Sequence, residues 1–522
     1  MATPKIKGGT RMKKLTALLL SAVLLLSLAA CKPAETQKAE EKKEPAVTAE
    51  KKEEPAKTED KKEEKPEEKP EEKKEATENK EVVKLKWVLI GGSQPANYDA
   101  WKEHINKYLV EKIGVELDVE IISWGDWDTK RGVMVSTNEP YDIMFTNMGT
   151  FVHDVELGAF KDITELLETT PDLKGLMPDM YWDSVKVNGQ IYGVPTYKDS
   201  SMTGYFIWDK EMLDKYEIKN VEELNTLEKA EPALQKITDG EKKPALILAQ
   251  GQGIAPIEFY DQMGLGLPIG VKVDDTERKV VYTFNQENVR KHYDHLHSMF
   301  KKGIINSDAL TLTEVPKYRA FYWAQGWSGA AKTVWGPNMG KEVVAIQNGE
   351  TILTNDTVRG SINCISANSK HPEKALQLLE LVNTDTYVRD ALYYGLEGDN
   401  FTYTSDKKVH KNNSDWSMAG YAQGTFFNVS MVDDVDFNQW DEVKALNEKA
   451  VASVLLGFNV STEEFEDELA NCREVNNKYM NQIITGAGDP AEVFPKLEKE
   501  LKDAGLDTII EKVQAQINET YK

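Results

Sequence analysis

The sequence predicts an α/β fold with two lobes, in which helices cover parallel strands. Apolar runs typical of strands alternate with amphipathic helical segments in the first part of the chain. This alternation is typical of parallel sheets covered by helices. The segment from residue 84 to residue 522 is also longer than one ordinary hydrophobic core, so two lobes are expected.

The expected elements follow in chain order. A buried strand at 85–90 (LKWVLI) ends at two glycines and precedes an amphipathic helix at 97–113. The remaining expectations are a strand at 115–122, a helix at 126–136, a strand at 141–145, a loop and short helix at 159–167, a helix at 287–302 and a strand at 329–334.

Polar and aromatic residues follow each of the first three predicted strands. The segments are 91–94 (GGSQ), 123–127 (SWGDW) and 146–149 (TNMG). Ligands of parallel α/β sheets bind at the carboxyl ends of the strands. The candidate ligand-binding residues here are Ser93, Gln94, Trp124, Asp126, Trp127 and Asn147.

The amino-terminal segment has the pattern of a secretory signal. A basic start precedes an apolar run at 15–28, and Leu28-Ala29-Ala30-Cys31 closes it. Cleavage before a cysteine is the bacterial lipoprotein variant, so we expect a signal peptide at 1–31 and a lipid on the thiol of Cys31. The alternative is a transmembrane helix, but the run is short for a hydrocarbon core of ~30 Å. The predicted location is the outer face of the cytoplasmic membrane, through a lipid anchor.

Residues 32–83 have the composition of a linker. They carry 14 Lys and 18 Asp or Glu, with many Pro and Ala and no aromatic residue. Such a stretch cannot bury enough apolar surface to offset its chain entropy, so it is predicted to be disordered and extended.

Charge and cysteine content narrow the class of partner. The chain has 64 Lys+Arg and 87 Asp+Glu, a formal net charge of −23, most of it outside the linker. An acidic body argues against nucleic acid and anionic lipid as partners. Cys364 and Cys472 are expected to be separate buried thiols, although a disulfide is the alternative outside the cell.

No motif indicates catalysis, a cofactor or a metal. Residues 326–329 (GWSG) miss the spacing of a nucleophile elbow. His292, His295 and His297 do not share one helix face, so zinc is not expected. An acidic run lacks the glycine and final glutamate of a calcium loop and is interpreted as solvated; its members are Asp433, Asp434, Asp436, Asn438 and Asp441.

Several stretches resemble the extracellular solute-binding proteins of bacterial sugar importers. Residues 189–195 (GQIYGVP), followed by 205–216 (YFIWDKEMLDKY), resemble the crossing strand of that family. Residues 139–144 resemble its third strand, and 368–383 resemble the helix after the return crossing. Further stretches resemble a Gram-positive branch with an extra C-terminal helical domain: 123–130, 394–398 and 501–516.

The resemblance implies a two-lobed fold of the periplasmic-binding-protein type II. An N-terminal lobe would comprise 84–197 plus 361–395, and a C-terminal lobe 198–360 plus 396–522 with a helical extension. The lobes would close on a ligand like a hinged trap. The loaded protein, a non-catalytic monomer, would then dock on a permease driven by a cytoplasmic ATPase.

An oligosaccharide is the predicted ligand, because aromatic rings match the C–H face of a sugar and amides or carboxylates match its hydroxyls. The chain has 11 Trp, and Trp335 with Asn338 sits where maltose-binding-type relatives place a stacking aromatic. Tyr197 and Asp199 after the first crossing, and Glu397 in a glycine turn, complete the candidate set. Trp124, Trp323 and Trp327 are equally well explained by packing, and a helix cap is the alternative role for Glu397.

Three other functions remain open. A peptide binder on the same scaffold would need charged anchors, for which only Arg131 and Arg319 are available. A surface adhesin or sensor would work without a transporter. A secreted glycosidase would need two carboxylates about 5–10 Å apart, for which Asp126 and Glu397 are the candidates.

Overall fold

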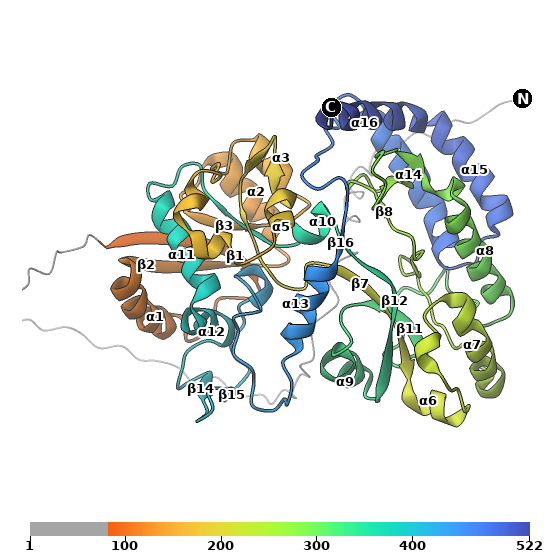
Figure 1. Cartoon of the computed structure of the whole chain (residues 1–522), viewed down its shortest axis with the longest axis horizontal. Helices are drawn as coiled ribbons and strands as arrows, with labels where there is room; N and C mark the ends of the chain where they lie inside the picture. Colours follow the sequence, from red (N-terminus) through yellow and green to blue (C-terminus); the bar gives the residue numbers. More distant parts are fainter. Residues whose placement is uncertain (1–81) are drawn as a thin grey trace, which may run out of the picture. The chain divides into compact units, whose positions relative to one another are not determined.

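The computed structural model describes residues 82–522 (Figure 1). The predicted signal peptide, Cys31 and nearly all of the predicted linker lie outside the described residues. Within residues 82–522, no helix is long and apolar enough to cross a membrane.

The first lobe is built on a five-stranded mixed sheet with the order β2-β1-β3-β13-β6. Strand β1 pairs in parallel with β2 and β3, as predicted, whereas β13 is antiparallel to β3 and β6. The bounds are β1 Val83–Gly91, β2 Val115–Ser123, β3 Ile143–Thr146, β6 Val194–Pro195 and β13 Ile362–Ile365.

Helices and two small hairpins surround this sheet. The helices are α1 Tyr98–Ile113, α2 Trp127–Thr137, α3 Phe151–Glu156, α4 Pro171–Lys174, α5 Asp179–Ser184, α11 Pro372–Thr384 and α12 Thr386–Tyr394. The hairpins pair β4 Lys186–Val187 with β5 Gln190–Ile191, and β14 Phe401–Tyr403 with β15 Val409–Lys411. Short 3-10 helices span Leu166–Thr169 and Gly420–Ala422.

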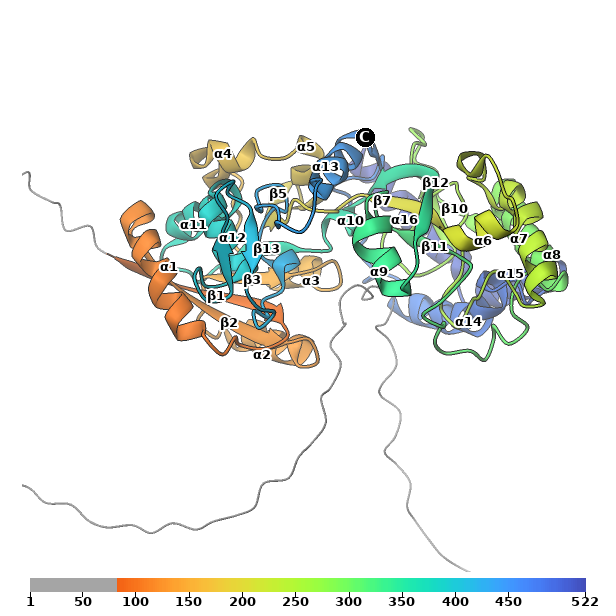
Figure 2. The same ribbon diagram turned by 90° about the horizontal axis from the view of Figure 1, so that it is seen from below.

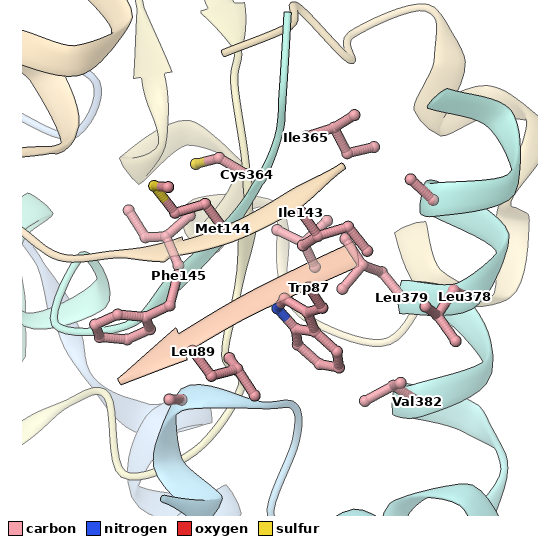
Figure 3. Packing of buried hydrophobic residues seen from close by; sticks show 14 of the residues in the cluster. Trp87, Leu89, Ile143, Met144, Phe145, Cys364, Ile365, Leu378, Leu379 and Val382 are labelled. Carbon is pink, nitrogen blue, oxygen red and sulfur yellow. The ribbon is translucent and has the colours of Figure 1, made fainter. Parts of the chain in front are cut away.

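The core of the first lobe centres on Trp87 in β1. Figure 3 shows its indole lying between the strands and Leu378, Leu379 and Val382 of α11. Trp87 is fully buried, and its Nε1 donates to the side-chain oxygen of Asn363 in β13 (3.0 Å). This bond satisfies a polar group that would otherwise be costly in the core.

The outer edge of β2 is covered by side chains. The Asn106 amide of α1 donates to the carbonyl of Leu117 (3.0 Å) and accepts from its N–H (2.7 Å). The Tyr98 hydroxyl accepts from the N–H of Val119, and the Gln94 amide bonds the backbone of Val119 and Ile121. Gln94, a predicted ligand-binding residue, is thus engaged with the sheet edge.

The second lobe is built on a four-stranded sheet with the order β11-β7-β12-β16. Strand β7 is antiparallel to both β11 and β12, unlike the parallel strands at the start of the first lobe. The strands are β7 Met202–Asp209, β11 Phe321–Gln325, β12 Val343–Leu353 and β16 Val451–Ala452, beside a small sheet of β8 Tyr260–Asp261, β9 Ile269–Lys272 and β10 Val281–Tyr282.

Helices form the other layer of the second lobe: α15 contacts α8, and α14, α15 and α16 contact one another (Figure 1). The predicted helix at 287–302 corresponds to α8, and the predicted C-terminal helical extension is present. The bounds are α6 Lys210–Lys215, α7 Leu227–Glu241, α8 Glu287–Lys301, α14 Glu466–Ile484, α15 Pro490–Asp503 and α16 Leu506–Thr520, with 3-10 helices at Val221–Glu223 and Thr283–Asn285.

The strand predicted at 329–334 is wrong. The chain instead forms a π-helix, Ala331–Trp335, which continues into α9 Gly336–Met339 beside β11 and β12 (Figure 2). The Glu442 carboxylate accepts the N–H groups of Ser328 (2.7 Å) and Gly329 (2.9 Å) just before this helix. A partner 113 residues away thus holds the turn before the helix, a contact that the local apolar pattern could not reveal.

Three segments join the two sheets. They are residues 196–201, the stretch 354–361 with α10 Asn355–Val358, and the stretch 423–450 with α13 Gln439–Lys449. The first core also includes Met418, Ala419 and Ala422, which the predicted boundary at 395 assigned to the other lobe. The lobe boundaries themselves stay predictions.

Cys364 in β13 and Cys472 in α14 are separate, fully buried free thiols, as predicted. Burial raises the pKa of both thiols, that of Cys472 to about 11. Each thiol belongs to a different hydrophobic core.

We therefore expect both thiols to resist a disulfide reagent at pH 8 in the native protein carrying Cys31→Ser. For Cys472, a pKa of about 11 instead of about 9 lowers the thiolate fraction roughly 100-fold. The pKa of Cys364 is raised as well, and burial limits access to both thiols. Absorbance of the released thiolate measures the reaction, and both thiols should react at once in denaturant. Rapid labelling of the native protein would contradict this packing.

Candidate functional site

The carboxyl ends of β1, β2 and β3 bring four of the predicted residues together. Because the three strands are parallel and β1 lies in the middle, Ser93 after β1 lies between Trp124 after β2 and Asn147 after β3. Asp126 follows Trp124 in the same loop. Trp124 is 49% exposed, an unusual state for a side chain of its size.

The indole of Trp124 is held in place although it is exposed. Its Nε1 donates to the Tyr421 hydroxyl (3.2 Å), and its backbone N–H donates to the carbonyl of Gly91 (3.1 Å). A Cβ at Gly92 would lie 3.3 Å from the indole, so the glycine lets the ring lie against the backbone. The Ser417 hydroxyl donates to the carbonyl of Ser93 (2.9 Å), which joins the Tyr421 segment to the strand ends.

A buried arginine organises the loop that carries Tyr421. Arg389 of α12 is fully buried, and its Nε donates to the carbonyl of Thr425 (2.7 Å). Its other nitrogens donate to the Gln423 side chain (2.8 Å) and to the carbonyls of Gly420 (3.0 Å) and Gly424 (3.2 Å). Burial lowers its pKa to about 10. No carboxylate in the described part of the chain forms an ion pair with it.

The other polar residues at these strand ends are ordered by their own contacts. The Asp126 carboxylate accepts from the Ser123 hydroxyl (2.9 Å) and lies 3.5 Å from the Lys130 ammonium. The bond from Ser123 and the charge of Lys130 lower the pKa of Asp126, so it is a carboxylate at neutral pH. The Asn147 side chain accepts from the N–H of Gly149 (3.0 Å) and keeps its amide donors available.

Three aromatic residues predicted to stack on ligand are buried in this structure. Trp127 is 2% exposed and packs on Phe145, because the first residue of α2 faces the sheet. Tyr197 is 1% exposed and lies between Tyr181 and Phe427. Trp335 is 8% exposed and packs on Tyr205. None of them presents a ring face to solvent here, so we do not carry them into the proposed site.

The remaining candidates are accessible but lie on other segments. Asp199 is half-buried in the first crossing segment and pairs with Lys198 (2.9 Å). Asn338 is exposed on α9, and Glu397 is exposed in the turn after α12. This turn reaches the carboxyl end of β1, since the Asn97 amide donates to Asp399 (2.7 Å) and Asn400 (2.8 Å).

A second group of aromatic residues involves α13. Trp440 packs on Trp327 (ring centroids 5.8 Å apart) and on Phe426 (4.6 Å). Beside it, a cavity of about 790 Å³ is lined by Lys332, Lys341, Phe437 and Glu442, among others. No local pattern connects Trp440 or Glu442 with the loop at Trp327, because more than 100 residues separate them.

The histidines and acidic residues that suggested metals have other partners. His292 bonds the carbonyl of Ile254 (2.7 Å), His295 lies 3.1 Å from Glu231, and His297 bonds the carbonyl of Gly486 (2.8 Å). Asn438 caps α13. Among residues 82–522, no cluster of three or more His, Cys, Asp or Glu side chains could hold a metal ion.

Two family models match the chain. Residues 103–396, more than half of the chain, match the bacterial extracellular solute-binding proteins. Residues 454–522 match a domain of unknown function (DUF3502). A relative from Streptococcus pneumoniae, named as a carbohydrate ABC transporter substrate-binding protein, is 27% identical over 85% of this chain and 92% of its own length.

Solved structures agree with the two-lobed fold. An N-glycan transport solute binding protein from Streptococcus pneumoniae is 26% identical, with a TM-score of 0.75 over 84% of this chain and 99% of its own. The same protein in complex with Man5GlcNAc gives a TM-score of 0.61 at 26% identity, over 84% and 98%. An extracellular solute-binding protein from Bifidobacterium longum subsp. infantis, 13% identical with a TM-score of 0.58 over 84% and 98%, supports the fold alone. Fold, strand-end site and family match lead to one conclusion: the chain belongs to the bacterial extracellular solute-binding proteins.

Proposed function

We propose that this protein captures an oligosaccharide outside the cell and delivers it to an ABC transporter permease. The observation that carries this proposal is the half-exposed indole of Trp124, fixed by Tyr421 at the carboxyl ends of three parallel strands. An exposed, immobilised aromatic ring suits the apolar C–H face of a sugar. An aromatic surface with a few placed polar groups is also the usual composition of a small-molecule site.

Polar groups beside Trp124 supply the complement to sugar hydroxyls. Asp126 is an ionised acceptor, the Asn147 amide is a donor, and the Ser93 hydroxyl can do either. The relatives support the ligand class, since one is named as a carbohydrate-binding protein and another was solved with Man1GlcNAc and with Man5GlcNAc. We therefore propose that one sugar ring of the oligosaccharide stacks on the indole of Trp124.

The proposal includes a lipid anchor at Cys31, a linker over 32–83 and no catalytic activity. The anchor and linker rest on the sequence pattern alone. Absence of catalysis rests on the family, whose members bind substrates.

A peptide ligand is less consistent with the structure. Arg131, one of the two candidate anchors, is buried and forms an ion pair with Asp154. The other, Arg319, lies over the ring of Tyr322 (3.8 Å). Neither arginine lies at the strand-end site, where a free peptide carboxylate would need a cation.

Titration calorimetry tests the ligand class directly. The protein is titrated with a panel of host and plant glycans that includes Man1GlcNAc and Man5GlcNAc, and separately with a peptide library. We expect heat of binding from at least one oligosaccharide and none from peptides. Peptide binding without glycan binding would overturn the proposal, and glycan cleavage that is lost in Asp126→Asn would establish an enzyme instead.

Replacing Trp124 with Ala should weaken oligosaccharide binding by about 30-fold, or ~2 kcal/mol, as expected for an aromatic binding hot spot. Stability should change little, because half of the indole is already exposed to solvent. The matched control is Leu157→Ala, which removes another exposed apolar side chain, 59% exposed, after α3. Equal effects of the two substitutions would contradict a specific role for Trp124.

Arg389→Lys should lower both stability and affinity. A lysine has three donors and a flexible stem, so it cannot reproduce the four bonds of the guanidinium, and we expect a loss of about 2–3 kcal/mol in the free energy of unfolding. Tyr421→Phe, which removes only the acceptor for Trp124, should cost less than about 1 kcal/mol in stability and still weaken binding roughly threefold. Urea denaturation and calorimetry separate these effects; unchanged affinity in both variants would show that the loop does not support the site.

A further inference from the structure

The C-terminal domain of unknown function starts at the junction between the lobes. Its family match begins at residue 454, directly after β16. Residues 453–461, here named the strap, run from β16 toward α14 and contact α10. Helix α10 belongs to the segment that joins β12 of the second sheet to β13 of the first.

One buried side chain fastens the strap to α10. Asn355, 9% exposed, donates to the carbonyls of Leu455 (3.2 Å) and Phe458 (2.8 Å) and accepts from the N–H of Gly457 (2.9 Å). These three bonds use both N–H donors and the oxygen of the amide. They fix the strap against the connecting helix.

The strap also contacts the first lobe. Asn459 donates to the carbonyl of Lys186 in β4 (3.1 Å), which also accepts from Arg359 just after α10 (3.3 Å). Gly457 has a φ of +80°, and a Cβ there would lie 3.1 Å from the carbonyl of Asp183. Leu456 packs against the core of the first lobe. Helix α10 and the strap thus share one anchor point on that lobe.

The other strap residues are fastened to the second lobe. Leu455 and Phe458 belong to its core. Arg278 donates to the carbonyl of Val454 (3.0 Å), and the Gln516 amide of α16 bonds both backbone groups of Ser461 (both 2.9 Å). Consecutive residues Leu455 and Leu456 therefore belong to different cores.

We propose that this domain sets the hinge of the protein, with the strap holding α10 as a fixed pivot between the lobes. A polypeptide segment embedded in both cores permits rotation about the pivot but opposes sliding of one lobe past the other. Rotation without sliding is what a closing binding protein requires. The inference depends on the two-lobed fold and not on the identity of the ligand.

Spin-label distance measurements on the ligand-free protein test this role. Cysteines replace Val133 and Leu310, which are exposed on the first and second lobes (51% and 37%), in a full chain carrying Cys31→Ser. The buried Cys364 and Cys472 stay unlabelled. Asn355→Ala and Asn459→Ala should each broaden the distance distribution. Amide exchange across 453–461 should be about five- to tenfold faster in Asn355→Ala, the effect of losing hydrogen bonds of ordinary strength.

The matched control is Gln516→Ala, which removes two strap bonds to the second lobe and none to α10 or the first lobe, and should leave the distance distribution unchanged. Circular dichroism verifies folding; if Asn355→Ala does not fold, Asn459→Ala, at a half-buried position, decides the question. A native-like distribution in every folded variant of Asn355 and Asn459 would overturn the proposal. Broadening in Gln516→Ala of the same size would overturn it as well, since the first-lobe contacts would then have no special role.

Discussion

The guanidinium of Arg389 imposes the strongest single constraint on the first lobe. A charge that leaves water must be matched by hydrogen bonds, because an unmatched buried ion costs several kcal/mol. Here the match comes from three carbonyls and one amide side chain of residues 420–425. That loop has little regular structure, so its conformation depends on the hydrogen bonds from Arg389. Its shape in turn fixes Tyr421, and through Tyr421 the indole of Trp124.

The same loop is joined to the sheet from its other side. Asn363 of β13 donates to the carbonyls of Ala422 (3.0 Å) and Gln423 (3.1 Å) while accepting from Trp87. The central tryptophan of the core and the exposed tryptophan of the site are thus linked through one strand and one loop. Rigid support of this kind reduces the ordering cost of binding.

Local pattern predicted the first half of the first lobe well. Within residues 85–145, each strand and helix can be recognised from the spacing of its own apolar residues. The three expected strands and two expected helices are present. The antiparallel second sheet was not predictable in this way, because pairing partners such as β7 and β11 lie more than 100 residues apart. The π-helix at Ala331–Trp335 was missed for the same reason, since Glu442 caps the turn before it.

The candidate site shows the same division. The predicted strand ends indicated the correct part of the surface, but the sequence did not show which tryptophan is exposed. Trp124 is exposed and Trp127 is buried, because α2 begins at Trp127 and directs its indole toward the sheet. Tyr421 and Arg389 carry no local signal, because their importance arises from contacts made across the fold. The sequence therefore predicted where the candidate site lies, and tertiary packing determines which side chains are exposed there.

The side chains along β2 have a further consequence. A bare edge strand offers alternating donors and acceptors to any extended chain, including a second copy of the same protein. Asn106, Tyr98 and Gln94 occupy those positions with hydroxyl and amide groups that imitate a neighbouring strand. The lobe therefore occupies the hydrogen-bonding groups of its own edge strand. Even at high local concentration, copies of the protein would not pair through β2 into a shared sheet.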